Sequence, residues 1–212
     1  MMTAETFFRT ISSMSDPSVN DETPRPLAKR NAWLLFLLIA CGIAGLDLWS
    51  KSAVFELLNV KCAGLPARII AAPREMTIIP GFFDLQANFN YGAFNGWFSE
   101  HTGLLALLSC AALLVIGSVL WYSLGRSPAP SAWFVAALGL LAGGTAGNLY
   151  DRYFLEAVRD WIKWYVTIDG KEHIWPNFNI ADSGICIGVV LIVLLEFFRR
   201  SPPATEEGRD TA

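Results

Sequence analysis

Residues able to support acid–base chemistry gather in the last third of this chain. Asn148, Asp151 and Arg152 follow one another at i, i+3 and i+4, so on a helix they cluster on one side of its end. Two further carboxylates, Asp160 and Asp182, belong to separate elements, as a facing pair requires. Two carboxylates held close in a low-dielectric site share a proton, so one can act as a base toward water while the other donates to a carbonyl oxygen. The pattern therefore favours hydrolysis of an amide bond without a covalent intermediate.

Other catalytic arrangements have little support in the sequence. The four cysteines and two histidines are scattered, at Cys41, Cys62, Cys110, Cys186, His101 and His173. Their spacing fits neither a metal site nor a disulfide framework, so we expect no metal and no cofactor. The net charge of -3 argues against nucleic acid as the main partner.

The elements that must position these residues are strongly apolar. Hydrophobic residues make up 53% of the chain and charged residues only 17%, and the mean hydropathy is +0.40; an average soluble domain has about 25% charged residues. Segments long enough to cross a bilayer are predicted at residues 32–49, 103–124, 131–150 and 181–198. Six tryptophans lie near their ends, as in an aromatic belt: Trp33, Trp49, Trp97, Trp121, Trp133 and Trp175. We therefore expect a mainly α, polytopic membrane protein with a bundle of four transmembrane helices.

The third segment carries Gly139, Gly143 and Gly147 at intervals of four residues. This spacing exposes backbone along one helix face and lets a neighbouring helix approach closely. Packing alone explains the glycines, but it does not explain the polar cluster at the end of the segment. Polar groups are costly in hydrocarbon, so the cluster predicts a functional site.

Asp47 and Lys51 lie four residues apart at the end of the first segment and can pair on one helix face. We interpret them as an interfacial salt bridge, and a direct catalytic role is the alternative.

Residues 83–90 alternate strictly between apolar and polar side chains, which predicts a half-buried strand. The apolar side comprises Phe83, Leu85, Ala87 and Phe89, and the polar side comprises Asp84, Gln86, Asn88 and Asn90. Turn signals flank the segment, so we expect a small extramembrane sheet that presents Asn90 near a tight turn, although a generic loop hairpin fits the same pattern. Residues 167–171, with Asp169 and Gly170 at the centre, resemble a second hairpin turn.

Residues 1–30 and 201–212 are predicted to be disordered tails that flank one membrane domain, residues 31–200. Four spans place both termini on one side, and Lys29, Arg30, Arg199 and Arg200 next to helix ends favour the cytoplasm. An alternative is a secretory signal, because the run that ends at Cys41 imitates a lipoprotein cleavage box, but three later spans and the long leading tail fit such a signal badly.

The polar motifs together resemble those of the lipoprotein signal peptidase family, also called signal peptidase II. The matching motifs, in chain order, are Asp47-x-x-x-Lys51, Asn90-x-Gly92-Ala93, Gly147-Asn148-x-x-Asp151-Arg152, Val158-x-Asp160 and Phe178-Asn179-x-Ala181-Asp182. The resemblance spans about residues 32–200. Any one motif alone is weak evidence, but the ordered set on four spans is specific.

The resemblance implies an intramembrane aspartic endopeptidase of the bacterial inner membrane. It would cleave diacylglyceryl-modified prolipoproteins just before the lipidated cysteine, near the extracytoplasmic face, where a small β-sheet or cradle and a periplasm-facing loop carry part of the site. Asp160 and Asp182 match the catalytic pair. Residues matching the substrate-binding or supporting positions are Asn90, Asn148, Asp151, Arg152, Asn179, Asp47 and Lys51. Substrate lipoproteins and membrane lipids are the expected partners, and we expect a monomer.

The sequence departs from the family pattern at three places: Phe94-Asn95 follow the Asn-x-Gly-Ala motif, Glu156 replaces a usual glycine, and the Asp169-Gly170 hairpin lengthens the gap between the two catalytic aspartates. We expect these changes to affect substrate preference more than catalysis. A proton-coupled transporter is the rival function, because intramembrane carboxylates also relay protons. That function predicts acids near the middle of the spans and an inverted repeat, whereas the acids lie near span ends and no repeat is evident. A purely structural scaffold would leave the polar cluster unexplained.

Overall fold

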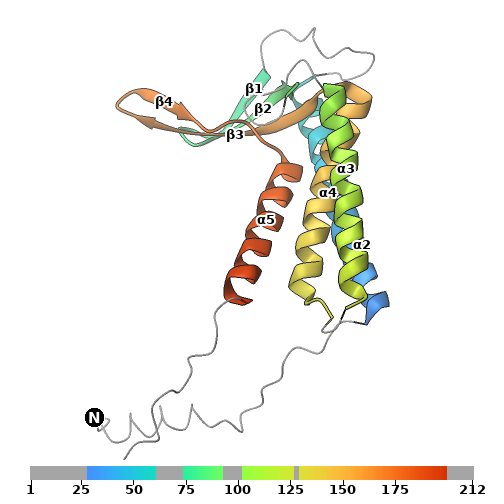
Figure 1. Cartoon of the computed structure of the whole chain (residues 1–212). Coiled ribbons are helices and arrows are strands. Elements are labelled where there is room, and N and C mark those ends of the chain that lie inside the picture. The colour runs from blue at the N-terminus through green and yellow to red at the C-terminus, as the bar shows by residue number, and fades with distance from the viewer. Residues whose placement is uncertain (1–27, 61–73, 93–101, 127–128, 200–212) are drawn as a thin grey trace, which may run out of the picture.

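The computed structural model describes residues 28–60, 74–92, 102–126 and 129–199. Its helices are α2 (Lys29–Leu57), α3 (Thr102–Leu124), α4 (Ala132–Leu155) and α5 (Ile180–Arg199). Each is long and apolar enough to cross a membrane. α4 packs against the other three helices, and a small sheet lies across one end of the bundle (Figure 1). The expected four-helix membrane architecture is therefore confirmed.

Two helices extend beyond their predicted ends. α2 continues to Leu57, so Asp47 and Lys51 lie inside the helix rather than at its end. α4 continues to Leu155, and Glu156 then ends it in the left-handed conformation with φ 56°. Glycine is favoured at such a position because a Cβ is strained there. The departure from the family glycine at residue 156 therefore falls on a helix-ending position and not within the acidic cluster.

The glycines of α4 bring neighbouring backbones close on two sides. A Cβ on Gly143 would lie 2.5 Å from the carbonyl oxygen of Ala40, and one on Gly147 would lie 2.5 Å from Oδ2 of Asp47. These glycines face α2, as the predicted close approach requires. Gly144, which the sequence pattern did not single out, meets the carbonyl oxygen of Ala181 at the start of α5. Small residues on two faces of α4 therefore allow α2 and α5 to pack closely against this helix.

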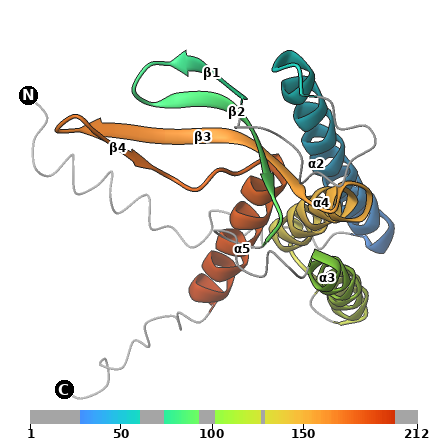
Figure 2. The same ribbon diagram turned by 90° about the horizontal axis from the view of Figure 1, so that it is seen from above.

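The sheet contains β1 (Arg74–Ile79), β2 (Phe83–Asn90), β3 (Val158–Ile168) and β4 (Lys171–Ile174), antiparallel and in that spatial order. The predicted strand at residues 83–90 is confirmed. The predicted hairpin turn is confirmed as well, with Asp169 and Gly170 at φ 52° and 74°. β1 was not predicted, because all six of its residues are exposed and their pattern does not alternate. Seen from above, β3 and β4 project sideways past α5, away from the other helices (Figure 2).

A β-bulge changes the predicted arrangement of side chains on β2. Asp84 lies opposite Lys163 of β3, whereas Asn88 lies opposite Asp160, and the register shifts between Leu85 and Asn88. Residues 160 and 163 are three apart, so they face opposite sides of β3. The polar residues of β2 therefore do not share one face of the sheet, and the bulge turns the end of β2 toward Asp160.

Some expectations concern residues outside the described ranges. These are residues 1–27 of the predicted tail at 1–30 and the whole predicted tail at 201–212, together with Cys62, Ala93, Phe94, Asn95, Trp97, His101 and Arg200. Lys29 and Arg30, which were assigned to the first tail, lie in α2.

Candidate active site

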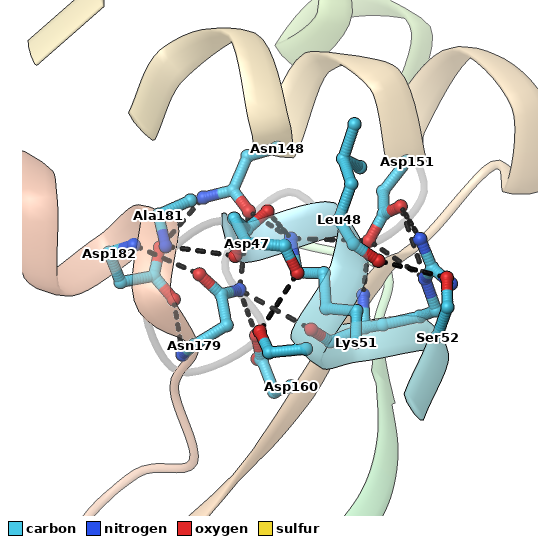
Figure 3. A network of polar contacts seen from close by, with 12 residues as sticks. Asp47, Leu48, Lys51, Ser52, Asn148, Asp151, Asp160, Asn179, Ala181 and Asp182 are labelled. Atoms are coloured by element: carbon cyan, nitrogen blue, oxygen red, sulfur yellow. Dashed lines mark hydrogen bonds and ion pairs between the residues drawn. The ribbon is translucent and has the colours of Figure 1, made fainter. Parts of the chain in front are cut away.

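Asn179 immediately precedes α5 and connects the two central aspartates. Its Oδ1 accepts a hydrogen bond of 2.9 Å from the backbone N–H of Asp182, and its own backbone N–H donates to Oδ2 of Asp182 at 3.2 Å. This reciprocal pair is a capping-box arrangement, which satisfies donors at the helix start. Its Nδ2 donates at 2.7 Å to Oδ1 of Asp160. Asn179 is fully buried and lies between the two carboxyl groups (Figure 3).

Asp160 comes from β3 and is almost completely buried. Its second oxygen, Oδ2, accepts a hydrogen bond of 3.1 Å from Asn90 at the end of β2. Burial raises the pKa of Asp160, and the negative charge of Asp182 raises it further. Together they bring it to about 8, although the hydrogen bonds from Asn90 and Asn179 act in the opposite direction. This environment therefore favours the protonated form of Asp160.

Asn148 of α4 forms the second connection between the aspartates. Its Nδ2 donates to Oδ1 of Asp182 at 2.8 Å. Its Oδ1 accepts from Asn179 at 3.2 Å and from Nζ of Lys51 at 2.9 Å. Side chains from α2, α4, β2, β3 and α5 therefore form one continuous polar network around the two carboxylates, as Figure 3 shows for most of its members.

Lys51 lies at the base of this network, fully buried, with Nζ 2.6 Å from Oδ2 of Asp47 and 3.3 Å from Oδ2 of Asp151. Oδ1 of Asp47 accepts a hydrogen bond of 2.9 Å from the backbone N–H of Ala181. The predicted pairing is thus observed, but the pair is buried rather than interfacial, because α2 runs on past it and α4 and α5 cover it. Asp47 and Lys51 support the positions of Asn148 and the start of α5.

Asp151 is held by a residue that the sequence motifs did not indicate. Arg159 donates to its carboxylate through Nη2 at 2.7 Å, through Nε at 3.2 Å and through its backbone N–H at 3.0 Å. Its Nη1 also donates to Ser52 at 3.2 Å. The only sequence signal was the strand alternation around Val158-Arg-Asp160, which places residue 159 on the side opposite Asp160. Asp151 is therefore paired with Arg159 and Lys51, and not with Arg152, which adjoins it in the chain.

Arg152 lies beside the two aspartates and donates from Nη2 to the carbonyl oxygen of Gly92 at 3.3 Å. Within the described residues, its buried Nε has no hydrogen-bond partner. This unpaired donor is a candidate contact for a carbonyl group of a bound chain.

A cleft of about 480 Å³ opens beside Asp160. Its walls come from the end of β2 and from the segment that descends from β4 to α5. They consist of Gln86, Asn88, Phe89, Asn90, Tyr91, Asp160, Ile174, Trp175, Pro176 and Asn177. Amide and aromatic groups therefore surround a space next to the buried carboxyl of Asp160. Within the described ranges, no group of three or more His, Cys, Asp or Glu residues could hold a metal ion.

The chain is similar in sequence to one family of proteins and similar in fold to solved structures. A family model described as signal peptidase (SPase) II matches residues 39–198. The lipoprotein signal peptidase of Rhodopirellula baltica is 33% identical over 92% of this chain and 88% of that protein. The one from Sulfurihydrogenibium sp. is 34% identical over 78% of this chain and 92% of that protein. A solved structure described as a bacterial membrane enzyme superposes with a TM-score of 0.62 at 24% identity, covering 82% of this chain and 94% of that chain, and thereby supports the fold.

Proposed function

This chain belongs to the signal peptidase II family, and from that premise we propose that it is an aspartic endopeptidase of diacylglyceryl-modified prolipoproteins. It cleaves just before the lipidated cysteine and so removes the signal peptide. The observation that carries the proposal is the connection of Asp160 on β3 to Asp182 on α5 through the single side chain of Asn179.

The two carboxyls hold one proton between them at neutral pH. Because the pKa of Asp160 is about 8, this residue carries the proton and donates it to the carbonyl oxygen of the scissile bond. Asp182 takes a proton from a water molecule, whose oxygen attacks the carbonyl carbon. Asp182 then passes that proton to the leaving nitrogen as the C–N bond breaks, and Asp160 recovers its proton from the hydroxyl that becomes the new carboxyl group. Both carboxyls return to their starting states.

The carboxamides and the arginine have positioning roles in this mechanism. Asn148 and Asn179 orient the carboxyls through bonds of 2.8 Å and 2.7 Å, respectively. The free Nε of Arg152 binds a backbone carbonyl of the substrate. Such groups act by fixing the geometry before the reaction, which is the usual source of large rate effects in preorganised sites.

The location of the site suits a substrate anchored in lipid. Asp182 lies in the first turn of α5, and Asp160 lies in the sheet directly above it. The diacylglycerol chains remain in the bilayer while the adjacent peptide bond reaches the two aspartates. The segment after the cut extends into the cleft beside Asp160. We place this end of the bundle at the extracytoplasmic face and both termini in the cytoplasm of a bacterial inner-membrane protein.

The test is a gel-shift cleavage assay on protein purified in detergent with added lipid. A diacylglyceryl-modified prolipoprotein is compared with its unmodified form, for wild type, Asp160→Asn and Asp182→Asn. Asp84→Asn is the matched control, because Asp84 is a buried carboxylate of the same sheet that pairs with Lys163 on the other side of β3. Only wild type and the control should cleave, and only the lipidated form. Near-normal turnover by a folded Asp160→Asn or Asp182→Asn variant would contradict the aspartic mechanism.

A further inference from the structure

The β3–β4 hairpin exposes large apolar side chains on one face. Trp164, Val166 and Ile168 alternate along β3 and are 46%, 45% and 55% exposed. Trp175, directly after β4, is 61% exposed and donates its backbone N–H to the carbonyl oxygen of Trp164. Continuing the register of Tyr165 opposite Ile174 places it across from Trp164. We call these four residues the apolar hairpin face. Phe82 extends it, because its ring stacks on Trp164 at 6.1 Å.

The apolar hairpin face is turned toward the helix bundle. Asp160 is separated from Trp164, Val166 and Ile168 by even numbers of residues along β3, so all four side chains lie on the same side of the strand. Asp160 contacts Asn179 at the start of α5, which shows that this side faces the helix ends. The hairpin projects sideways past α5, so its outer half extends over the region where the bilayer must surround that helix (Figures 1 and 2).

The opposite face of the hairpin is mainly polar, although Ile174, which lies opposite Tyr165 and is 54% exposed, belongs to it as well. Nζ of Lys163 pairs with Glu75 at 3.0 Å and with Asp84 at 3.1 Å. The hydroxyl of Tyr165 donates to Asp84 at 3.2 Å. Thr167, opposite Glu172, continues this face toward the turn. Apolar side chains therefore dominate the face turned toward the helix ends, and paired polar side chains dominate the other face.

The second strand adds basic groups to the apolar side. Lys171 lies opposite Ile168, and His173 lies opposite Val166, so both belong to the same face as their partners. A row of apolar side chains beside a row of basic ones matches the boundary between acyl chains and anionic headgroups. Tryptophan is also enriched at the membrane–water interface, where one end of its ring system is apolar and the other is wet.

We propose that the apolar hairpin face rests in the headgroup region of the bilayer next to α5. α5, which the hairpin passes, also exposes apolar side chains: Ile187, Val190 and Val193 are 53%, 54% and 60% exposed. The hairpin thereby anchors β3 at its outer end, while Asn179 and Asn90 hold Asp160 near its inner end. The bilayer thus helps to keep β3 seated on the start of α5, so the two aspartates remain aligned.

Two neighbouring residues of β3 provide a matched test. In a variant in which the four cysteines are replaced by serine, Ile168→Cys and Thr167→Cys are each labelled with the environment-sensitive dye NBD. The proteins are reconstituted into vesicles of phosphatidylethanolamine and phosphatidylglycerol. Quenching is then measured with a lipid that carries a nitroxide near its headgroup, and separately with aqueous iodide. The two labels lie on opposite faces at the same distance along the hairpin.

We expect the label at residue 168 to lose roughly half of its emission to the lipid-borne quencher, because an interfacial face sits only ~5–10 Å below the surface. Iodide should barely affect it. The label at residue 167 should respond in the opposite way. Equal iodide quenching at both positions, with no lipid quenching at 168, would overturn the proposal. The readout does not depend on peptidase activity, so it stands apart from the test of the proposed function.

Discussion

Asn179→Ser separates the two tasks of the residue that connects the aspartates. Serine keeps a side-chain oxygen that can accept from the backbone N–H of Asp182, so the cap of α5 survives, since serine and asparagine cap helices about equally well. Serine has no second donor group that could replace Nδ2 of asparagine and reach Asp160. The hydrogen bonds of 2.7 Å to Asp160 and 3.2 Å to Asn148 are therefore lost.

The expected loss in kcat follows from the strength of the hydrogen bond between Asn179 and Asp160, which becomes ionised in the transition state. A hydrogen bond to a charged group contributes about 1.5–3 kcal/mol. At 1.36 kcal/mol for each tenfold change in rate, its loss in the transition state lowers kcat by a factor of roughly 10–150. The unfolding temperature should change little. Asn179→Ala should lose the same factor in kcat and, in addition, about 1 kcal/mol of stability, because it removes the cap as well.

The pH profile gives an independent readout. Nδ2 of Asn179 stabilises the ionised form of Asp160, so its removal raises the pKa of Asp160 above the wild-type value of about 8. Wild-type activity should fall as the pH rises through about 8, where Asp160 loses its proton, and in Asn179→Ser this decline should move to higher pH. The measurements are kcat for the lipidated substrate across pH and thermal unfolding in the same detergent. A serine variant with wild-type kcat and an unchanged alkaline limb would refute this role of Asn179.

Three further outcomes are expected. Gly144→Ala should abolish most cleavage and lower the free energy of unfolding by about 1–3 kcal/mol, because the added Cβ would overlap the first turn of α5. Gly42→Ala is the control: a Cβ added there would have no neighbouring atom within 4 Å, so this variant should resemble wild type in cleavage and in unfolding. Arg159→Met should cost about 3–5 kcal/mol in denaturant unfolding by leaving Asp151 short of its main partner, and the double variant Asp151→Leu/Arg159→Met should lose less than the sum of the two single changes; strict additivity would argue against the pair. The pKa of Asp160 is raised from 3.8 to about 8 on folding, so wild type loses stability progressively as the pH rises from about 4 to about 8. Asp160→Asn lacks this loss and should unfold at a higher temperature than wild type at about pH 9 but not at about pH 4, and equal pH dependence in both proteins would contradict the buried, protonated state.

Much of the fold follows from local properties of the sequence. Long apolar runs predict four helices because a bilayer accepts only backbone that satisfies its own hydrogen bonds. The alternation at residues 83–90 and the Asp169-Gly170 turn are equally local, and both are observed. The helix ends were less predictable. The spacing of Asp47 and Lys51 predicted their pairing, but it did not indicate that α2 continues past them, that both are buried, or that Asp151 of α4 is a further partner of Lys51.

The candidate site shows the same division. The sequence by itself determined which carboxylates, carboxamides and basic groups are available, and the order of the motifs indicated the family. Only the tertiary structure decided their partners: Arg159 rather than Arg152 holds Asp151, and a bulge in β2 turns Asn90 toward Asp160. Which buried charges meet depends on the close approach of α2 and α5 to α4 and on strand register. These distances arise from packing between segments far apart in the chain, so local sequence patterns do not encode them individually.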